Sequence, residues 1–134
     1  MTKRVLSVGQ CMPDGMAIKA FLGQQFTATV QSSETADDAM VMLHNGSYDL
    51  ILVNRVFDAD GSSGLDLIKA IKASATTSKI PVMLVSNFDD AQQKAVELGA
   101  EPGFGKEDLG AEPLVQRLRP FLESSADEDD AESS

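Results

Sequence analysis

The chain has 134 residues, of which 43% are hydrophobic, and its formal net charge is −10 at pH 7. This length suits a single domain, and lysines and arginines scattered through an acidic chain argue against direct binding to nucleic acid. No apolar run approaches the roughly 20 residues of a membrane span. The single cysteine, Cys11, excludes an internal disulfide and fits a reducing compartment, so we expect a cytoplasmic protein.

The acidic residues are concentrated at the C-terminal end. Residues 123–134, ESSADEDDAESS, contain six acids and no base. A segment of this composition cannot bury enough apolar surface to offset the entropy lost on folding. We therefore expect one domain at residues 1–123 and an acidic, disordered tail at residues 124–134.

The N-terminal half alternates short apolar runs, which predict strands, with segments of helical periodicity. In chain order these are a strand at 5–8, a helix opened by Pro13, a strand at 26–30, a helix at 34–44 and a strand at 49–53. We expect Ser33 to cap the second helix. The apolar run Leu50–Val53 is too short for a helix and predicts a strand buried on both faces, with Asn54 at its carboxyl end.

The C-terminal half continues the alternation. In chain order it predicts a helix at 64–75, a strand at 80–85, a helix at 89–98, a strand of poor propensity at 101–106 and a helix at about 111–123. We expect Asn87 or Asp89 to cap the fourth helix and Pro120 to remove a hydrogen bond from the last one. Five strands alternating with five helices predict an α/β fold with a doubly wound, five-stranded parallel sheet.

Several local strings accompany this order of elements. They are KRVLSV, YDLILVN, GLDLIKAIK, IPVMLVS and AVELGAEPGFGK. In this order and spacing, over about residues 3–123, they resemble the receiver domain of bacterial response regulators. That family is a flavodoxin-like (βα)5 module that accepts a phosphoryl group from a histidine kinase.

The resemblance implies a set of site residues at the carboxyl ends of the strands. In the family, an acidic pair after the first strand and an Asp ending the third strand bind magnesium, and that Asp accepts the phosphoryl group. Gly9 and Gln10 stand at the acidic pair, and Asn54 stands at the phosphoacceptor. Ser86 and Lys106 retain the hydroxyl and lysine positions of the family.

These departures bear on the chemistry of the site. Magnesium is retained by carboxylates, which neither a glycine nor an amide supplies, and an amide is a far weaker nucleophile than a carboxylate. We therefore expect no metal, no cofactor and no catalytic residue, and hence not an enzyme. Gly103 stands at the aromatic switch of the family, and Glu107 replaces a proline. We expect Lys106 to hydrogen-bond the side-chain oxygen of Asn54 or a loop carboxylate such as Asp58, the alternative being a surface lysine.

The main hypothesis is a degenerate receiver, or pseudo-receiver, of a two-component or phosphorelay system that acts as a phosphorylation-independent protein-interaction module. By the resemblance, its contact face is the fourth helix, the fifth strand and the fifth helix, roughly residues 89–98 and 111–122. The expected partners are a histidine kinase, a phosphotransfer protein, another receiver, an output protein or a second copy of the chain. Neither nucleic acid nor a membrane is expected as a partner.

Two alternatives remain open from the residues. In the first, a ligand-sensing pseudo-receiver takes an anion or a small metabolite in a pocket lined by Gly9, Gln10, Asn54, Ser86 and Lys106. In the second, a substitute aspartate, Asp58, accepts the phosphoryl group from a position four residues past the strand. A calcium loop starting at Asp58 is not favoured, because Lys69 falls where the bidentate acid belongs. Cys11 and His44 are interpreted as packed or solvated residues.

Overall fold

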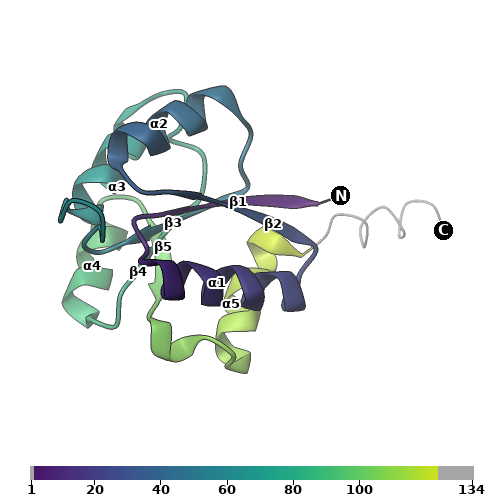
Figure 1. Cartoon of the computed structure of the whole chain (residues 1–134). Helices are drawn as coiled ribbons and strands as arrows, with labels where there is room; N and C mark the ends of the chain where they lie inside the picture. Colours follow the sequence, from purple (N-terminus) through teal and green to yellow (C-terminus); the bar gives the residue numbers. More distant parts are fainter. Residues whose placement is uncertain (1, 124–134) are drawn as a thin grey trace.

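The computed structural model describes residues 2–123, which form a sheet covered by helices on both faces (Figure 1). The sheet is parallel, and its five strands lie in the order β2-β1-β3-β4-β5. The strands are β1 Lys3–Val8, β2 Ala28–Ser33, β3 Leu50–Asn54, β4 Val82–Val85 and β5 Glu101–Phe104. The predicted doubly wound, five-stranded parallel sheet is therefore confirmed, while the predicted tail at 124–134 lies outside the described residues.

The five helices divide between the two faces of the sheet. They are α1 Met12–Gln25, α2 Ala36–Asn45, α3 Gly64–Ala73, α4 Asp89–Glu97 and α5 Glu112–Leu122. The helices α1 and α5 pack on one face and share one apolar cluster, whereas α2, α3 and α4 share the cluster on the other face (Figure 1). Pro120 lies inside α5, as the sequence predicts.

The central strand β3 is buried on both faces. The four residues Leu50 to Val53 have no exposed surface. Ile51 and Val53 join the cluster under α2, α3 and α4, while Leu50 and Leu52 join the cluster under α1 and α5. An uninterrupted apolar run is needed here because successive side chains of a strand point to opposite faces. This strand fixes the position of Asn54 at the carboxyl edge of the sheet.

The second strand and the cap of α2 differ from the prediction. Phe26 ends α1 rather than beginning β2, because its N–H donates to the carbonyl of Leu22 at 2.9 Å. The strand β2 therefore starts at Ala28 and includes Ser33, so Ser33 is not the N-cap of α2. Thr35 caps α2 instead, since its side chain accepts the N–H of Asp38 at 3.1 Å.

The predictions around α4 and β5 also need correction. The N-cap position of α4 is Phe88, not Asn87 or Asp89, and its N–H donates to Oγ of Ser86 at 3.1 Å. The strand β5 ends at Phe104, so Lys106 is not a strand residue. Lys106 instead begins a 3-10 turn, Lys106–Asp108.

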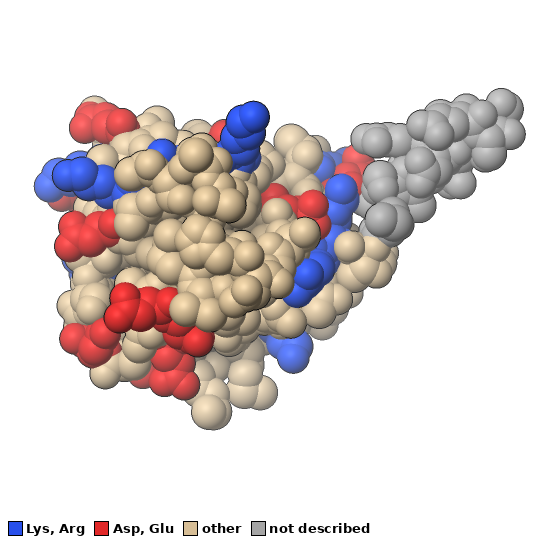
Figure 2. Space-filling model, turned by 90° about the horizontal axis from the view of Figure 1, so that it is seen from above, with Lys and Arg blue, Asp and Glu red and all other residues tan. Residues whose placement is uncertain are grey.

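Charged residues on one side of the molecule can be followed in Figure 2. On the side of the molecule viewed in Figure 2, acids and bases surround a large uncharged centre, with no continuous basic patch among the described residues of this face. Within residues 2–123, no helix combines the length and the apolar character needed to cross a membrane.

Candidate functional site

The predicted site residues lie where the carboxyl ends of β1, β3, β4 and β5 meet at one edge of the sheet. Gly9 and Gln10 follow β1, and Asn54 is the last residue of β3. Ser86 follows β4, and Lys106 lies two residues beyond β5. The structure joins Gly9 to Asn54 directly, whereas Ser86 and Lys106 each bond to residues that were not predicted to belong to the site.

Asn54 connects two loops through its side-chain amide. Its Nδ2 group donates to the carbonyl oxygens of Gly9 at 3.1 Å and Val56 at 2.8 Å. Its Oδ1 atom accepts the N–H of Arg55 at 3.0 Å. Both N–H groups and the oxygen of the amide are thus used, and each such bond contributes about 0.5–1.5 kcal/mol to stability. Asn54 therefore holds the β1–α1 loop against the β3–α3 loop.

This bonding pattern does not fit the divalent cation that the resemblance implies. Magnesium requires oxygen ligands, usually with one or two carboxylates among them. Here the N–H groups of Asn54 donate to the Gly9 and Val56 carbonyls, and its oxygen accepts the N–H of Arg55 rather than facing a cation. Among residues 2–123 there is also no group of three or more His, Cys, Asp or Glu side chains placed to hold a metal ion.

Gly9 is required by the packing around it. Its φ of +78° is a left-handed conformation that residues other than glycine rarely adopt. A Cβ atom at this position would overlap the ring of Phe57, which is only 1% exposed. The carbonyl of Gly9 also accepts the N–H of Asp58 at 3.0 Å. An acidic side chain at position 9 is therefore incompatible with the buried Phe57.

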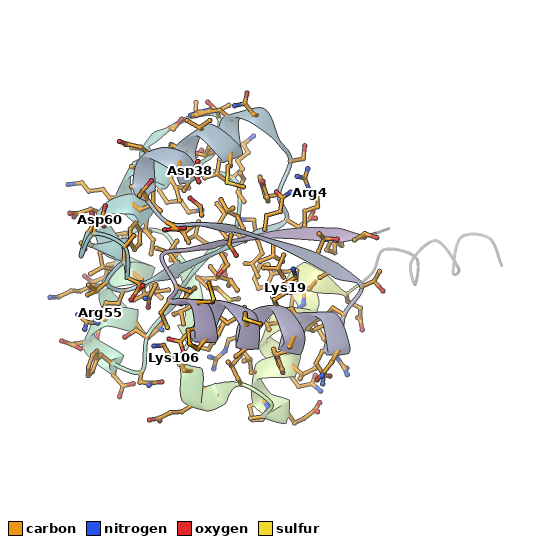
Figure 3. All side chains as sticks on the ribbon, in the orientation of Figure 1. Arg4, Lys19, Asp38, Arg55, Asp60 and Lys106 are labelled. Carbon is orange, nitrogen blue, oxygen red and sulfur yellow. The ribbon has the colours of Figure 1, made fainter. Side chains whose placement is uncertain are left out.

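Lys106 pairs with an acid that was not predicted to be part of the site. Its Nζ atom lies 2.5 Å from Oδ2 of Asp14, in the first turn of α1, beside which Lys106 is seen in Figure 3. The prediction that Lys106 bonds Asn54 or Asp58 is wrong. The Asn54 oxygen is engaged by the N–H of Arg55, and the turn that begins at Lys106 directs the lysine toward α1.

Asp14 gathers two donors. Besides Lys106, the thiol of Cys11 donates to its Oδ2 atom at 3.0 Å. These two groups, the Cys11 thiol first, hold the pKa of the Asp14 carboxyl below its usual value. The hydrogen bond to Asp14 in turn raises the pKa of Lys106. Both members of the pair are therefore charged at neutral pH.

The position of the family's aromatic switch is closed. A Cβ atom at Gly103 would overlap the carbonyl oxygen of Leu84. The side chain of Gln92, from α4, connects the ends of β4 and β5 at this position. Its Oε1 atom accepts the N–H of Gly103 at 3.0 Å, and its Nε2 group donates to the carbonyls of Leu84 at 2.8 Å and Ser86 at 3.0 Å. Gln92 was not predicted to have this role, because nothing in its helical spacing indicates it.

The five predicted residues do not line a common pocket. Gly9 and Gln10 line a cavity of about 380 Å³ between β1, β2, α1 and the β3–α3 loop. Ser86 lies in a separate groove of about 480 Å³ along α4 and β5. Asn54 and Lys106 line neither of them. The single vacated pocket expected from the sequence is thus divided.

Comparison with known proteins gives three relatives at low identity, and no family model matches the sequence. The chain is 27% identical over 117 residues to the gliding motility regulatory protein of Myxococcus xanthus. It is 25% identical over 100 residues to the chemotaxis protein CheY of Pseudomonas aeruginosa. It is 32% identical over 108 residues to the sensory transduction protein RegX3 of Mycolicibacterium smegmatis. These alignments cover 86%, 73% and 79% of this chain, but 15%, 77% and 44% of the respective relatives.

Solved structures match over most of the chain. The signal receiver domain of a DNA-binding response regulator from Colwellia psychrerythraea superposes with a TM-score of 0.73 at 25% identity, covering 88% of this chain and 96% of that domain. The chemotaxis protein CheY4 of Vibrio cholerae superposes with a TM-score of 0.74 at 16% identity, covering 91% of this chain and 100% of the other.

Proposed function

We propose that this chain, which has the flavodoxin-like receiver fold found in response regulators, is a signalling protein of a two-component or phosphorelay system that works by protein contacts without phosphorylation. The observation that carries the proposal is the state of Asn54. Its amide is bonded to the backbone through both its nitrogen and its oxygen, and an amide does not form the acyl phosphate that a carboxylate forms.

Two further features support the same reading. Phosphoryl transfer depends on positioning and on neutralising the charge of the transferred group. Gly9 is held against Phe57 and leaves no room for an acid that could retain a metal ion. The ammonium group of Lys106, which in the family contacts the phosphoryl oxygens, is neutralised by Asp14.

We assign the contact face to α4, β5, the turn that follows β5, and α5. The groove along these elements is lined by three acids, Asp89, Glu107 and Asp108, and by Arg117. Arg117 donates to the carbonyl of Gly103, so part of its hydrogen-bonding capacity is directed into the domain. The groove therefore favours a partner segment that carries lysine or arginine, and its affinity should fall as salt increases.

The absence of phosphorylation is tested by incubating the full chain with acetyl phosphate and magnesium and measuring its intact mass. We expect no added phosphoryl group, while a phosphorylatable CheY treated in parallel gains one. If the chain gains a phosphoryl group, the proposal fails. The Asp58→Asn variant then decides whether Asp58 is the substitute acceptor.

The contact face is tested with purified histidine kinases, phosphotransfer proteins and receivers of the source organism, and with the chain itself at increasing concentration. We expect one of these to bind and the Glu107→Lys variant to bind at least tenfold more weakly. Asp37→Lys is the matched control, because Asp37 also lies in the first turn of a helix but on α2, away from the groove. Equal losses in both variants would contradict the assignment of the face.

A further inference from the structure

The cavity beside α1 is not used by the proposed contact role. Its floor comes from Ser7 of β1 and from Gln10, and its walls come from the first turns of α1, the end of β2 and the β3–α3 loop. Lys19, labelled in Figure 3, contributes from α1. With a volume of about 380 Å³, the cavity reaches the size range of small-molecule sites, which begins at roughly 300 Å³.

The described residues whose buried side-chain atoms lack hydrogen-bond partners all line this cavity. Among the described residues, three buried side-chain N or O atoms make no hydrogen bond: Oγ of Ser7 and both Nε2 and Oε1 of Gln10. All three belong to residues that line the cavity, and Ser7 is only 1% exposed. Buried polar atoms without partners are rare in folded proteins, so three at one place indicate a missing partner.

The charges around the cavity favour a neutral partner over an anion. Glu34 and Asp58 line it together with one base, Lys19. Lys106, which would attract an anion, is held by Asp14 outside the cavity. A ligand carrying a phosphate would therefore meet two carboxylates and one ammonium group.

The unpaired groups also define the hydrogen-bonding pattern of the partner. A primary amide presents a donor beside an acceptor, and its complement is an acceptor beside a donor. The edge of adenine and an aromatic carboxamide both have this pattern, and glutamine pairs with adenine in this way in nucleic-acid recognition. Met12 and Met16, which are 77% and 65% exposed on α1, add adaptable thioether side chains that suit the face of a flat ring.

We propose that the cavity binds a neutral, planar small molecule with an amide-like edge, a nucleobase or nucleoside or an aromatic carboxamide, through the amide of Gln10 and the hydroxyl of Ser7. The Gln10 amide atoms and the Ser7 hydroxyl are both enclosed when no ligand is present, so both side chains rotate toward the cavity on binding. Because these atoms make no hydrogen bond in their present position, the rotation breaks none.

The test is a titration of the full, isotope-labelled chain with adenine, adenosine and nicotinamide, followed by backbone amide NMR. AMP and inorganic phosphate form the charged arms. We expect saturable, submillimolar binding of at least one neutral compound, with shifts at Ser7, Gln10 and Met16 and weaker binding of AMP. Gln10→Leu and Gln10→Glu should each weaken binding at least tenfold, while Gln24→Leu, at the exposed end of α1, should leave it unchanged.

Three results would overturn the proposal: no saturation by any neutral compound, undiminished binding in both Gln10 variants, or tighter binding of phosphate than of adenosine. The melting temperature of Ser7→Ala shows whether the missing partner of the Ser7 hydroxyl is a ligand or an ordered water molecule. Ser7→Ala should raise the melting temperature of the ligand-free chain, and a fall would mean that the hydroxyl is already bonded to ordered water. None of these results bears on the groove along α4 and β5, so the contact role stands or fails separately.

Discussion

Asn54 and Gln10 are amides at the carboxyl ends of the neighbouring strands β3 and β1, and they are in opposite hydrogen-bonding states. Asn54 has both its nitrogen and its oxygen bonded to backbone groups of two loops. Gln10 has neither its nitrogen nor its oxygen bonded, and it lines a cavity. Where the family has acids around one metal ion, this chain has a rigid connection on one side and an unfilled space on the other. Two amides that stand where the family has acids therefore have opposite hydrogen-bonding states at the ends of neighbouring strands.

The largest loss of stability on the Asn54 side of this comparison is expected for Gly9→Asp. The new side chain would overlap the Phe57 ring and force a left-handed conformation on a residue other than glycine. Together these effects should lower the free energy of unfolding by about 2–4 kcal/mol. Urea denaturation measures the loss. Gly23→Ala is the control, since a Cβ atom there meets nothing within 4 Å and should leave stability unchanged or raised. Equal stability of Gly9→Asp and the unmodified chain would disprove the packing argument.

The next largest effect is expected for Asn54→Asp. A carboxylate has no N–H to donate, so the carbonyls of Gly9 and Val56 lose their donor and face a negative charge. We expect a loss of about 1–3 kcal/mol of unfolding free energy, partly restored by added magnesium. Thermal denaturation with and without magnesium measures both. Gln93→Glu makes the same amide-to-acid change at an exposed position of α4 and should have little effect. If Asn54→Asp and Gln93→Glu change the melting temperature equally, the hydrogen bonds of Asn54 between the two loops contribute nothing to stability.

The comparison is sharpened by removing each amide in turn. Asn54→Ala should lower the free energy of unfolding by about 1–3 kcal/mol, because it leaves backbone groups without partners. Gln10→Leu should change it by less than about 1 kcal/mol or raise it, because it removes unpaired polar atoms from a buried place. Chemical denaturation of the two variants under the same conditions gives both values. A loss for Gln10→Leu as large as the loss for Asn54→Ala would mean that the two amides do not differ.

The smallest effect is expected at the Asp14–Lys106 pair. The lowered pKa of Asp14 means that its contribution to stability is present above the unfolded-state value of about 3.9 and disappears as pH falls through the folded-state value. The raised pKa of Lys106 means that its contribution disappears only as pH rises through a value above about 10.4.

Because the Lys106 side chain is 47% exposed, Asp14→Asn should cost less than about 1 kcal/mol at pH 7. The difference from the unmodified chain should vanish in acid, and a pH series of melting temperatures checks this. A difference that persists after the Asp14 carboxyl is protonated would assign it to packing.

The sequence predicts the fold well because periodicity is a local property. The uninterrupted run Leu50–Val53 identified the central strand, and the five predicted helices correspond to α1 to α5, whereas the 3-10 turn at Lys106–Asp108 was not predicted. Errors at element ends came from competition among neighbouring groups, as where Thr35 rather than Ser33 caps α2. The alternation and the right-handed crossover rule predict a doubly wound parallel sheet, but they do not fix the order β2-β1-β3-β4-β5, which the sequence analysis did not predict.

The site is predicted only in part, because its partners come from distant segments of the chain. The positions of Gly9, Gln10 and Asn54 could be read from the strand ends. That Phe57 would occupy the space above Gly9, or that Lys106 would reach Asp14, depends on how loops and turns lie in space. The one signal available for Phe57 was a single aromatic residue within the loop RVFDADGSSG.

The contact between Gly9 and Phe57 also limits the order in which substitutions can accumulate. An acid at position 54 alone would meet neutral neighbours, and an acid at position 9 would first require a smaller residue than Phe57. Introducing an acid at position 9 or at position 54 alone therefore gives a less stable protein. The steric contact between position 9 and Phe57 thus disfavours the return of an acid at position 9. Restoring an acid at position 9 would require position 57 to change first.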